Sequence, residues 1–166
     1  PLRRQRQMCI RDRGKVGFQQ SYGYFTWRNT AEELAEYLQE ISHETPAFYR
    51  PNLFVNTPDI LTEYLQHGGP GAFRIRAVVA ATASPLWGVY AGFELFEHVA
   101  RPGAEEYIDN EKFQLRPRDF DGAVQRGESL APYLTRLNQI RRDHPALGDL
   151  QNLTLQSASD DAIVAL

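Results

Sequence analysis

The sequence predicts an α/β protein built on a parallel β-sheet. Three segments rich in strand-forming residues alternate with segments of helical periodicity, in the order β-α-β-α-α-β, and this alternation is typical of parallel sheets. A long irregular segment, one more helix and two short β-type segments follow. Because three parallel strands cannot close a barrel of eight, the chain forms either a small open α/β sheet or the last part of a larger barrel.

Length and composition are those of one domain. The 166 residues suffice for a sizeable core, and a net charge of −3 does not indicate a nucleic-acid or membrane partner. The single cysteine excludes an internal disulfide, which fits a reducing compartment such as the cytoplasm. The four histidines lack metal-ligand spacing, and no apolar run approaches the ~20 residues of a membrane span.

Residues 1–13 differ from the rest of the chain. They contain five arginines against one acidic residue, Asp12, and they show no periodicity. Within them, Met8–Arg13 resembles translated sequencing-adapter read-through, so we expect residues 1–13 to be a non-native leader. The alternative is a basic arm that binds an anionic partner.

The first predicted strand covers residues 16–25, where β-branched and aromatic residues recur at even spacing. The next helix is predicted from Thr30 to about Ile41, because Thr30 and Glu33 form a capping-box pattern. Two prolines then predict a loop over residues 42–52.

Phe54 and Val55 are predicted to form a short buried strand that leads directly into a helix. Thr57 is suited to the N-cap and Pro58 to the first helical position. Asp59 would then lie in the first helical turn at the carboxyl end of a strand, where the active site of a β/α barrel is found. Alternatively, Asp59 only complements the helix dipole.

The helix that begins at Pro58 is predicted to end in a left-handed cap at Gly68-Gly69. A second, alanine-rich helix is predicted over residues 72–82, with Ser84-Pro85 as its breaker. Residues 86–95 are predicted to be a buried strand whose glycines allow close backbone approach.

The remaining part of the chain is predicted to be less regular. Residues 98–127 form a long charged loop, which in a compact domain is usually functional or disordered. The last helix is predicted over residues 129–144. Residues 153–155 and 162–164 are predicted to pair as a β-hairpin, which indicates the start of an all-β domain.

Polar residues follow all three predicted strands. Side chains of this kind at one end of a parallel sheet are typical of an active-site rim. Each residue alone is equally explained as a helix cap or a solvated loop residue. The residues are Arg28, Asn29, Asn56, Asp59 and Glu94.

Four stretches carry a resemblance to a known family. They are residues 17–29 (GFQQSYGYFTWRN), 56–66 (NTPDILTEYLQ), 87–95 (WGVYAGFEL) and 111–119 (EKFQLRPRD). They resemble the α-1,4-glucan:maltose-1-phosphate maltosyltransferases of glycoside hydrolase family 13, which move maltosyl units from α-maltose 1-phosphate onto α-1,4-glucans. The resemblance runs from about Gly14 to Leu166.

The resemblance implies that the chain is the C-terminal part of a (β/α)8 TIM barrel, about strands six to eight, followed by the start of a C-terminal β-sandwich. Residues 14–148 would belong to the barrel and residues 149–166 to the sandwich. The nucleophilic Asp and the acid Glu of the family lie on strands four and five, which this chain does not include. We therefore expect the chain to be inactive alone.

The resemblance also implies roles for individual residues in a retaining glycosyl transfer. Asp59 matches the carboxylate that stabilises the oxocarbenium-like transition state. Lys112 and Phe113 match a donor-binding pair that is usually Lys-Tyr, and Phe113 departs from this pattern because it lacks the hydroxyl. The family implies a cytoplasmic homodimer that needs no metal or organic cofactor.

Two other functions remain open at this point. The first is another family 13 enzyme, such as an α-amylase-type hydrolase or trehalose synthase, although these usually carry Asn-His-Asp where this chain has Asn56-Thr57-Pro58-Asp59. The second is a non-catalytic α/β carbohydrate-binding module, complete at this length, in which the basic residues 1–13 are a genuine arm.

Overall fold

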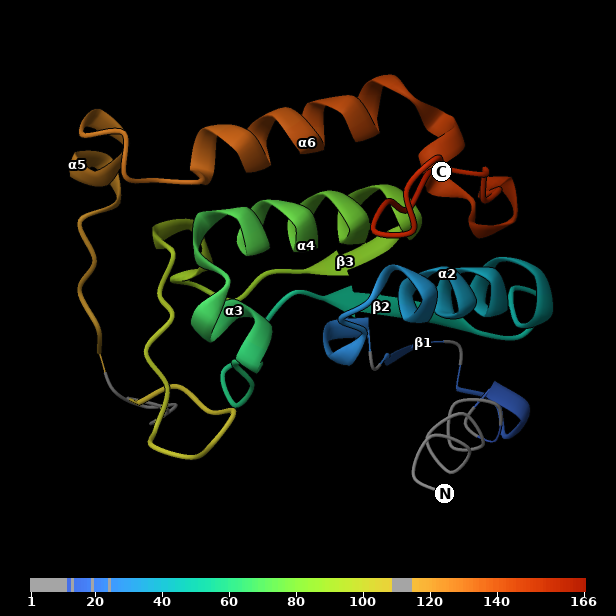
Figure 1. Ribbon diagram of the computed structural model, residues 1–166, viewed down its shortest axis with the longest axis horizontal. Coiled ribbons are helices and arrows are strands. Elements are labelled where there is room, and N and C mark those ends of the chain that lie inside the picture. Colours follow the sequence, from blue (N-terminus) through green and yellow to red (C-terminus); the bar gives the residue numbers. More distant parts are fainter. Residues whose placement is uncertain (1–11, 13, 19, 24, 109–114) are drawn as a thin grey trace.

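A three-stranded parallel sheet lies at the centre of the protein (Figure 1). The computed structural model describes residues 12, 14–18, 20–23, 25–108 and 115–166. The strands β1 (Gln20–Tyr22), β2 (Arg50–Phe54) and β3 (Leu86–Gly88) pair in the order β1-β2-β3, with Tyr22 opposite Asn52 and Phe54 opposite Gly88. The α/β class and the parallel pairing predicted from the sequence are confirmed.

Helices cover one face of this sheet. In Figure 1, α4 (Gly69–Ala83) lies beside β3 and β2, and α6 (Ala131–Asp143) lies along the outer side of α4. Leu53 and Val55 of the central strand region are fully buried against the helices, in one hydrophobic core with residues of α2 (Ala31–Gln39) and α4. Two further helices, α3 (Glu63–His67) and α5 (Phe120–Gln125), are short.

The start of α2 is fixed by the predicted capping box. The hydroxyl of Thr30 accepts a hydrogen bond from the Glu33 N–H at 3.1 Å, and the Glu33 carboxylate accepts one from the Thr30 N–H at 3.3 Å. After Gln39 the chain continues as a π-helical turn, Glu40–Glu44. Most of the loop predicted over residues 42–52 is therefore absent, because this turn occupies its first part and β2 already begins at Arg50.

The first predicted strand is shorter than expected. Of the described residues between 16 and 25, only Gln20–Tyr22 pair with β2, while Val16 and Phe18 are 74% and 61% exposed. Phe25–Trp27 forms a 3₁₀ turn in which Phe25 is fully buried. The even spacing of apolar residues therefore does not correspond to a buried strand face here.

The third predicted strand is also shorter. Of residues 86–95, only β3 pairs with β2, and the chain then turns at Gly92, which has a φ of +100°. The Gly92 N–H donates to the Glu94 carboxylate at 3.0 Å, and Phe93–Leu95 forms a 3₁₀ turn. Gly92 thus supplies a left-handed backbone conformation that only glycine adopts readily, and this conformation ends the extended segment.

The two predicted breaks around α4 are confirmed. Gly69 has a φ of +59°, as expected of a left-handed residue after a helix, although α4 begins at this same residue. At the other end, Ser84 is extended and the carbonyls of Ala81, Ser84 and Pro85 accept hydrogen bonds from the Arg141 guanidinium of α6. Arg141 thereby satisfies carbonyl groups that the end of a helix leaves without partners.

The C-terminal segment differs from the prediction in both directions. Residues 98–127 include the helix α5, and residues 145–152 form two 3₁₀ turns. In place of the hairpin predicted over residues 153–164, the described chain shows one antiparallel bridge between Gln156 and Ala165. The expectation of a non-native leader at residues 1–13 lies outside the described residues, apart from Asp12.

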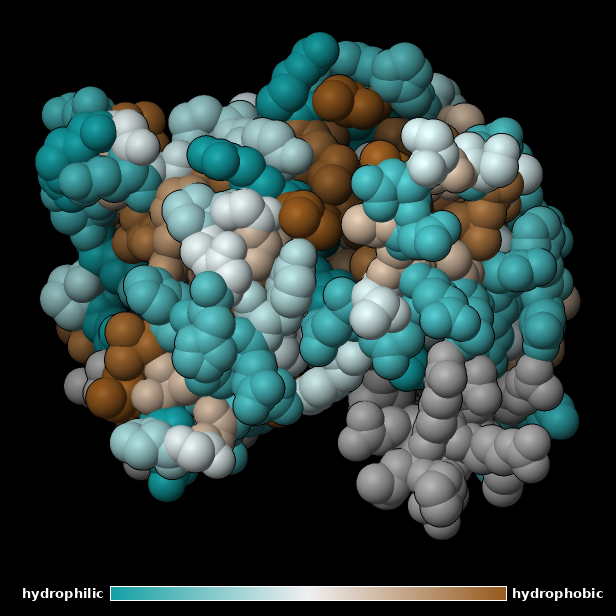
Figure 2. Space-filling model, viewed as in Figure 1, coloured by the Kyte–Doolittle hydropathy of each residue, from teal (hydrophilic) through white to brown (hydrophobic). Residues whose placement is uncertain are grey.

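The surface around α6 is hydrophilic on its outer side and apolar where α6 meets α4. Figure 2 shows hydrophilic side chains along the outer side of α6 and apolar ones gathered between α6 and α4. Among the described residues, no helix has both the length and the apolar character needed to cross a membrane.

Loss of the capping box should destabilise the fold measurably. We expect Thr30→Ala to lower the free energy of unfolding by about 1 kcal/mol, because the Glu33 N–H loses its acceptor. Urea denaturation of the purified chain measures this, with Thr30→Ser as the matched control. An unchanged denaturation midpoint in Thr30→Ala would show that the cap contributes nothing.

Candidate active site

A cavity of about 500 Å³ opens between the carboxyl ends of β1 and β2. In open α/β sheets, ligands bind at this end of the strands. The residues that line the cavity come from the end of each strand and from the turns that follow. They are Tyr22, Gly23, Thr26, Trp27, Phe54, Asn56, Thr57, Pro58, Asp59 and Ile60.

Asp59 lies on a tight turn rather than on a helix. The backbone of Thr57 and the backbone of Ile60 exchange two hydrogen bonds, at 3.1 and 3.3 Å. The Thr57 hydroxyl also accepts from the N–H groups of Asp59 and Ile60, at 3.2 and 2.9 Å. Pro58 occupies the second position of this four-residue turn, where its fixed φ is favourable. The helix predicted from Pro58 is therefore wrong at its start, since α3 begins only at Glu63.

This turn leaves Asp59 exposed at the cavity. The prediction that Asp59 lies at the carboxyl end of a strand is confirmed, because β2 ends at Phe54 and only Val55 and Asn56 separate it from the turn. The alternative role as a partner of the helix dipole is wrong, since Asp59 lies outside α3, which begins only at Glu63. A carboxylate in this position can interact with a ligand held between the two strand ends.

Asn56 connects three segments of chain at this end of the sheet. Its side chain is fully buried. Its Oδ1 accepts from the Tyr90 N–H at 2.8 Å, and its Nδ2 donates to the Tyr107 hydroxyl at 2.6 Å and to the Tyr90 carbonyl at 3.4 Å. Burial raises the pKa of Tyr107 to about 12, so its hydroxyl stays protonated at neutral pH.

Glu105 makes a second set of contacts beside the cavity. Its carboxylate accepts from the Trp27 indole N–H at 2.7 Å and from the Glu63 N–H at 3.0 Å, while its carbonyl accepts from the Leu61 N–H at 2.8 Å. Trp27 lines the cavity, and Leu61 and Glu63 follow the turn that carries Asp59. The sequence contains no signal for these contacts, because Glu105 is one acidic residue in a long irregular segment.

The other predicted rim residues do not line the cavity. The Asn29 amide oxygen accepts from Arg76 at 2.7 Å, the Arg28 guanidinium lies 5.8 Å from the centre of the Tyr37 ring, and Glu94 accepts from Gly92. These contacts stabilise the fold, so for Arg28, Asn29 and Glu94 the explanation as cap or loop residues is the better one.

Arg76 was not singled out by the sequence analysis, yet its side chain is only 1% exposed. Its guanidinium lies 4.3 Å from the centre of the Tyr64 ring and 5.4 Å from that of Phe25. Its Nε and Nη1 have no hydrogen-bond partner among the described residues. Burial lowers the pKa of Arg76 to about 10, although Tyr64 and Glu33 favour the charged form. Arg76 therefore remains a cation in the core at neutral pH.

Lys112 and Phe113 lie outside the described residues. The chain on both sides of them is anchored near the carboxyl end of the sheet. Tyr107 is bound to Asn56, and the Arg118 guanidinium donates two hydrogen bonds to the Glu97 carboxylate, at 2.6 and 3.0 Å. The Glu97 carboxylate raises the pKa of Arg118.

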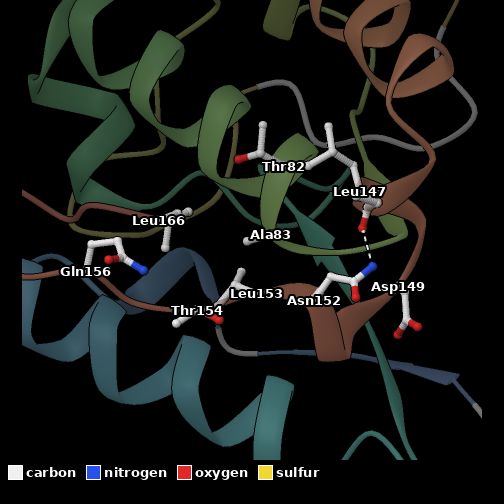
Figure 3. Close-up of a pocket in the computed structure, with 10 residues that line it drawn as sticks. Thr82, Ala83, Leu147, Asp149, Asn152, Leu153, Thr154, Gln156 and Leu166 are labelled. Atoms are coloured by element: carbon white, nitrogen blue, oxygen red, sulfur yellow. Dashed lines mark hydrogen bonds between the residues drawn. The ribbon is translucent and has the colours of Figure 1, made fainter.

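A second cavity, of about 610 Å³, lies at the opposite end of the sheet (Figure 3). It is formed by the end of α4, the turns after α6 and the last residues of the chain. Its lining includes the carboxylate of Asp149, which accepts from the Gln151 N–H, and the amide of Asn152, which donates to the Ala146 carbonyl. We therefore place the candidate site at the other end, with Asp59. No group of three or more metal-ligating side chains gathers in the part of the chain that the structure describes.

Comparison with known proteins gives close relatives but no matching family model. The chain is 59% identical over 152 residues to alpha-1,4-glucan:maltose-1-phosphate maltosyltransferase 2 of Streptomyces coelicolor. The aligned region covers 91% of this chain and 23% of that protein. It is 59% and 60% identical to the corresponding maltosyltransferases of Corynebacterium glutamicum and Mycolicibacterium smegmatis, over 91% of this chain and 22% of each relative. The chain thus spans less than a quarter of the length of these relatives.

The shape of the cavity wall depends on a glycine, and this can be tested. A Cβ at Gly88 would lie 2.4–2.8 Å from the ring atoms of Phe54, which lines the cavity. We expect Gly88→Ala to lower the free energy of unfolding by about 1–3 kcal/mol, because the ring must move.

Urea denaturation measures this effect, with Gly148→Ala as the control. A Cβ at Gly148 meets no atom within 4 Å, so this substitution should have little effect. Equal stability of the two variants would contradict the close packing of Phe54 against β3.

Proposed function

The chain belongs to the family of alpha-1,4-glucan:maltose-1-phosphate maltosyltransferases, and we propose that it forms part of the active site of an enzyme that transfers maltosyl units from maltose 1-phosphate to α-1,4-glucans. One observation carries this proposal beyond the sequence identity. Asp59, the residue that matches the transition-state stabiliser of the family, is exposed at a cavity at the carboxyl end of a parallel sheet.

Asp59 acts in this proposal on the charge that develops during transfer. As the bond between the anomeric carbon and the leaving oxygen breaks, positive charge accumulates on the sugar ring. A carboxylate fixed beside the ring stabilises that charge, and its contribution is greatest in the transition state. The hydrogen bonds within the Thr57–Ile60 turn support this role, because they fix the backbone of Asp59 before the donor binds.

Lys112 and Phe113 bind the donor in this proposal. Lys112 contacts sugar hydroxyl groups, and the Phe113 ring stacks on a sugar face without the polar contact of a tyrosine hydroxyl. The support is indirect: the chain is anchored on both sides of them, by Tyr107 and by Arg118, at the end of the sheet that carries Asp59.

The nucleophile and the general acid come from outside this chain. In the family these are an Asp and a Glu on barrel strands four and five, and we propose that β1, β2 and β3 are strands six, seven and eight. The C-terminal residues 149–166 would then begin the β-sandwich. By the same resemblance, the complete enzyme is a cytoplasmic homodimer of the α-glucan synthesis route and needs no cofactor.

A chimera tests the contribution of Asp59. The 152 matching residues of the Mycolicibacterium smegmatis relative are replaced by those of this chain, and phosphate release from maltose 1-phosphate is measured with an α-1,4-glucan acceptor. We expect the chimera to be active and Asp59→Asn to lower kcat by about 100- to 1,000-fold.

Elongation of the glucan without net hydrolysis distinguishes transfer from an amylase-type reaction. A chimera that unfolds cooperatively but turns over maltose 1-phosphate equally well with Asp59→Asn would contradict the proposed role of this carboxylate.

The isolated chain should show no turnover. We expect the purified 166-residue protein to release no phosphate from maltose 1-phosphate at any glucan concentration, because the nucleophile and the acid are contributed by other strands. The chimera at equal concentration serves as the positive control. Phosphate release by the isolated chain, abolished by Asp59→Asn, would overturn the assignment of these roles to other strands.

A further inference from the structure

None of the four side chains in the turn that carries Asp59 is buried. Asp59 is exposed, and Thr57, Pro58 and Ile60 are only partly buried. The hydrogen bonds between Thr57 and Ile60 fix the internal shape of the turn, but they do not fix its position relative to the sheet. The residues immediately before and after the turn contribute to that position.

On the amino side, the turn is held by Asn56. Asn56 adjoins Thr57 directly, and its fully buried side chain is bound to the Tyr107 hydroxyl at 2.6 Å. Its amide also makes two hydrogen bonds with the backbone of Tyr90, after β3. The last residue before the turn is therefore linked both to the segment that follows β3 and to Tyr107.

On the carboxyl side, the turn is held by Glu105, two residues before Tyr107. Leu61, which follows the turn directly, donates its N–H to the Glu105 carbonyl at 2.8 Å. The Glu105 carboxylate accepts from the Glu63 N–H at 3.0 Å. Its other oxygen accepts from the Trp27 indole, which lines the same cavity as Asp59.

We propose that Glu105–Tyr107 is a brace that positions Asp59 for transition-state stabilisation. The brace contacts the chain on both sides of the Thr57–Ile60 turn, through Asn56 and Tyr107 on one side and through Glu105 on the other. Asn56, Glu105 and Tyr107 are positioning residues in this scheme, because none of them acts on the sugar itself. The proposal rests on the proposed function, since it assigns to these residues the placement of the Asp59 carboxylate.

The physical reason is that transition-state stabilisation is sensitive to small displacements. A carboxylate displaced by about 1 Å loses much of its effect, and rate losses of about 100-fold follow from shifts of this size. An exposed turn that is held only by its own hydrogen bonds would allow such shifts. The brace removes this freedom, and it aligns Trp27 in the cavity wall through the same carboxylate.

The experiment uses the active chimera and compares substitutions that remove brace contacts with a matched control. Tyr107→Phe removes only a hydroxyl group, and Asn56→Ala removes the whole amide. Ser84→Ala is the control, because the Ser84 hydroxyl is a buried link between β2 and β3 at the other end of the sheet, bound to the Pro51 carbonyl at 2.9 Å. Each variant is first checked by thermal unfolding, and kcat and KM are measured on folded enzyme.

We expect Asn56→Ala and Tyr107→Phe to lower kcat by about 10- to 100-fold, with the KM for maltose 1-phosphate changed by less than about twofold. Ser84→Ala should lower the melting temperature as much as Tyr107→Phe while leaving kcat unchanged. In an Asp59→Asn background, Asn56→Ala should have almost no further effect on kcat, because residues that act through one another are not additive.

Two results would overturn the brace. One is a loss of kcat in Asn56→Ala and Tyr107→Phe no greater than in Ser84→Ala. The other is an equal loss of kcat in Asn56→Ala with Asp59 present and with Asp59→Asn. Failure of the proposed function gives a different result, namely an Asp59→Asn chimera with undiminished kcat.

Discussion

The candidate site depends on the hydrogen bonds of the buried Asn56 side chain. An amide removed from water has to make its hydrogen bonds within the protein, and an unpaired buried group costs about 1–3 kcal/mol. Asn56 meets this requirement with partners from two other segments, at Tyr90 and Tyr107. These segments therefore cannot move independently of the end of β2, and the geometry around Asp59 follows from this constraint.

The sequence predicted the parts of the fold that rest on local signals. The capping box at Thr30, the alanine-rich helix α4 and the alternation that implies a parallel sheet were all confirmed. The lengths of the outer strands were wrong, because the extent of a strand is set by the partner strand and not by its own composition. Within the described chain, β2 pairs with three residues of β1 and three of β3, and Phe25 and Phe93, which were predicted to lie in these strands, are part of 3₁₀ turns.

The site was predicted in part. The position of Asp59 followed from its place after a strand, but its backbone conformation did not. A Thr-Pro pair is suited both to the start of a helix and to the first half of a β-turn, and the Thr57 hydroxyl can accept the same neighbouring N–H groups in either case. The roles of Glu105 and Tyr107 carry no local signal, since their partners are 42 to 78 residues away. The resemblance to the maltosyltransferases identified Asp59 as the residue of interest but gave no information on what holds it.

The separation of these partners along the sequence also affects the order in which the protein acquires its structure during folding. The hydrogen bonds that form α2, α4 and α6 join residues close in sequence, so the chain loses little entropy before each is formed. The contacts of Glu105 with Trp27 and with Glu63 close loops of 78 and 42 residues, which costs more entropy and slows their formation. We therefore expect the helices to form before the loop from Glu97 to Ile108 makes its contacts with Trp27 and Glu63. In the proposed scheme, Asp59 reaches its final place only at that late stage, after the helices have formed.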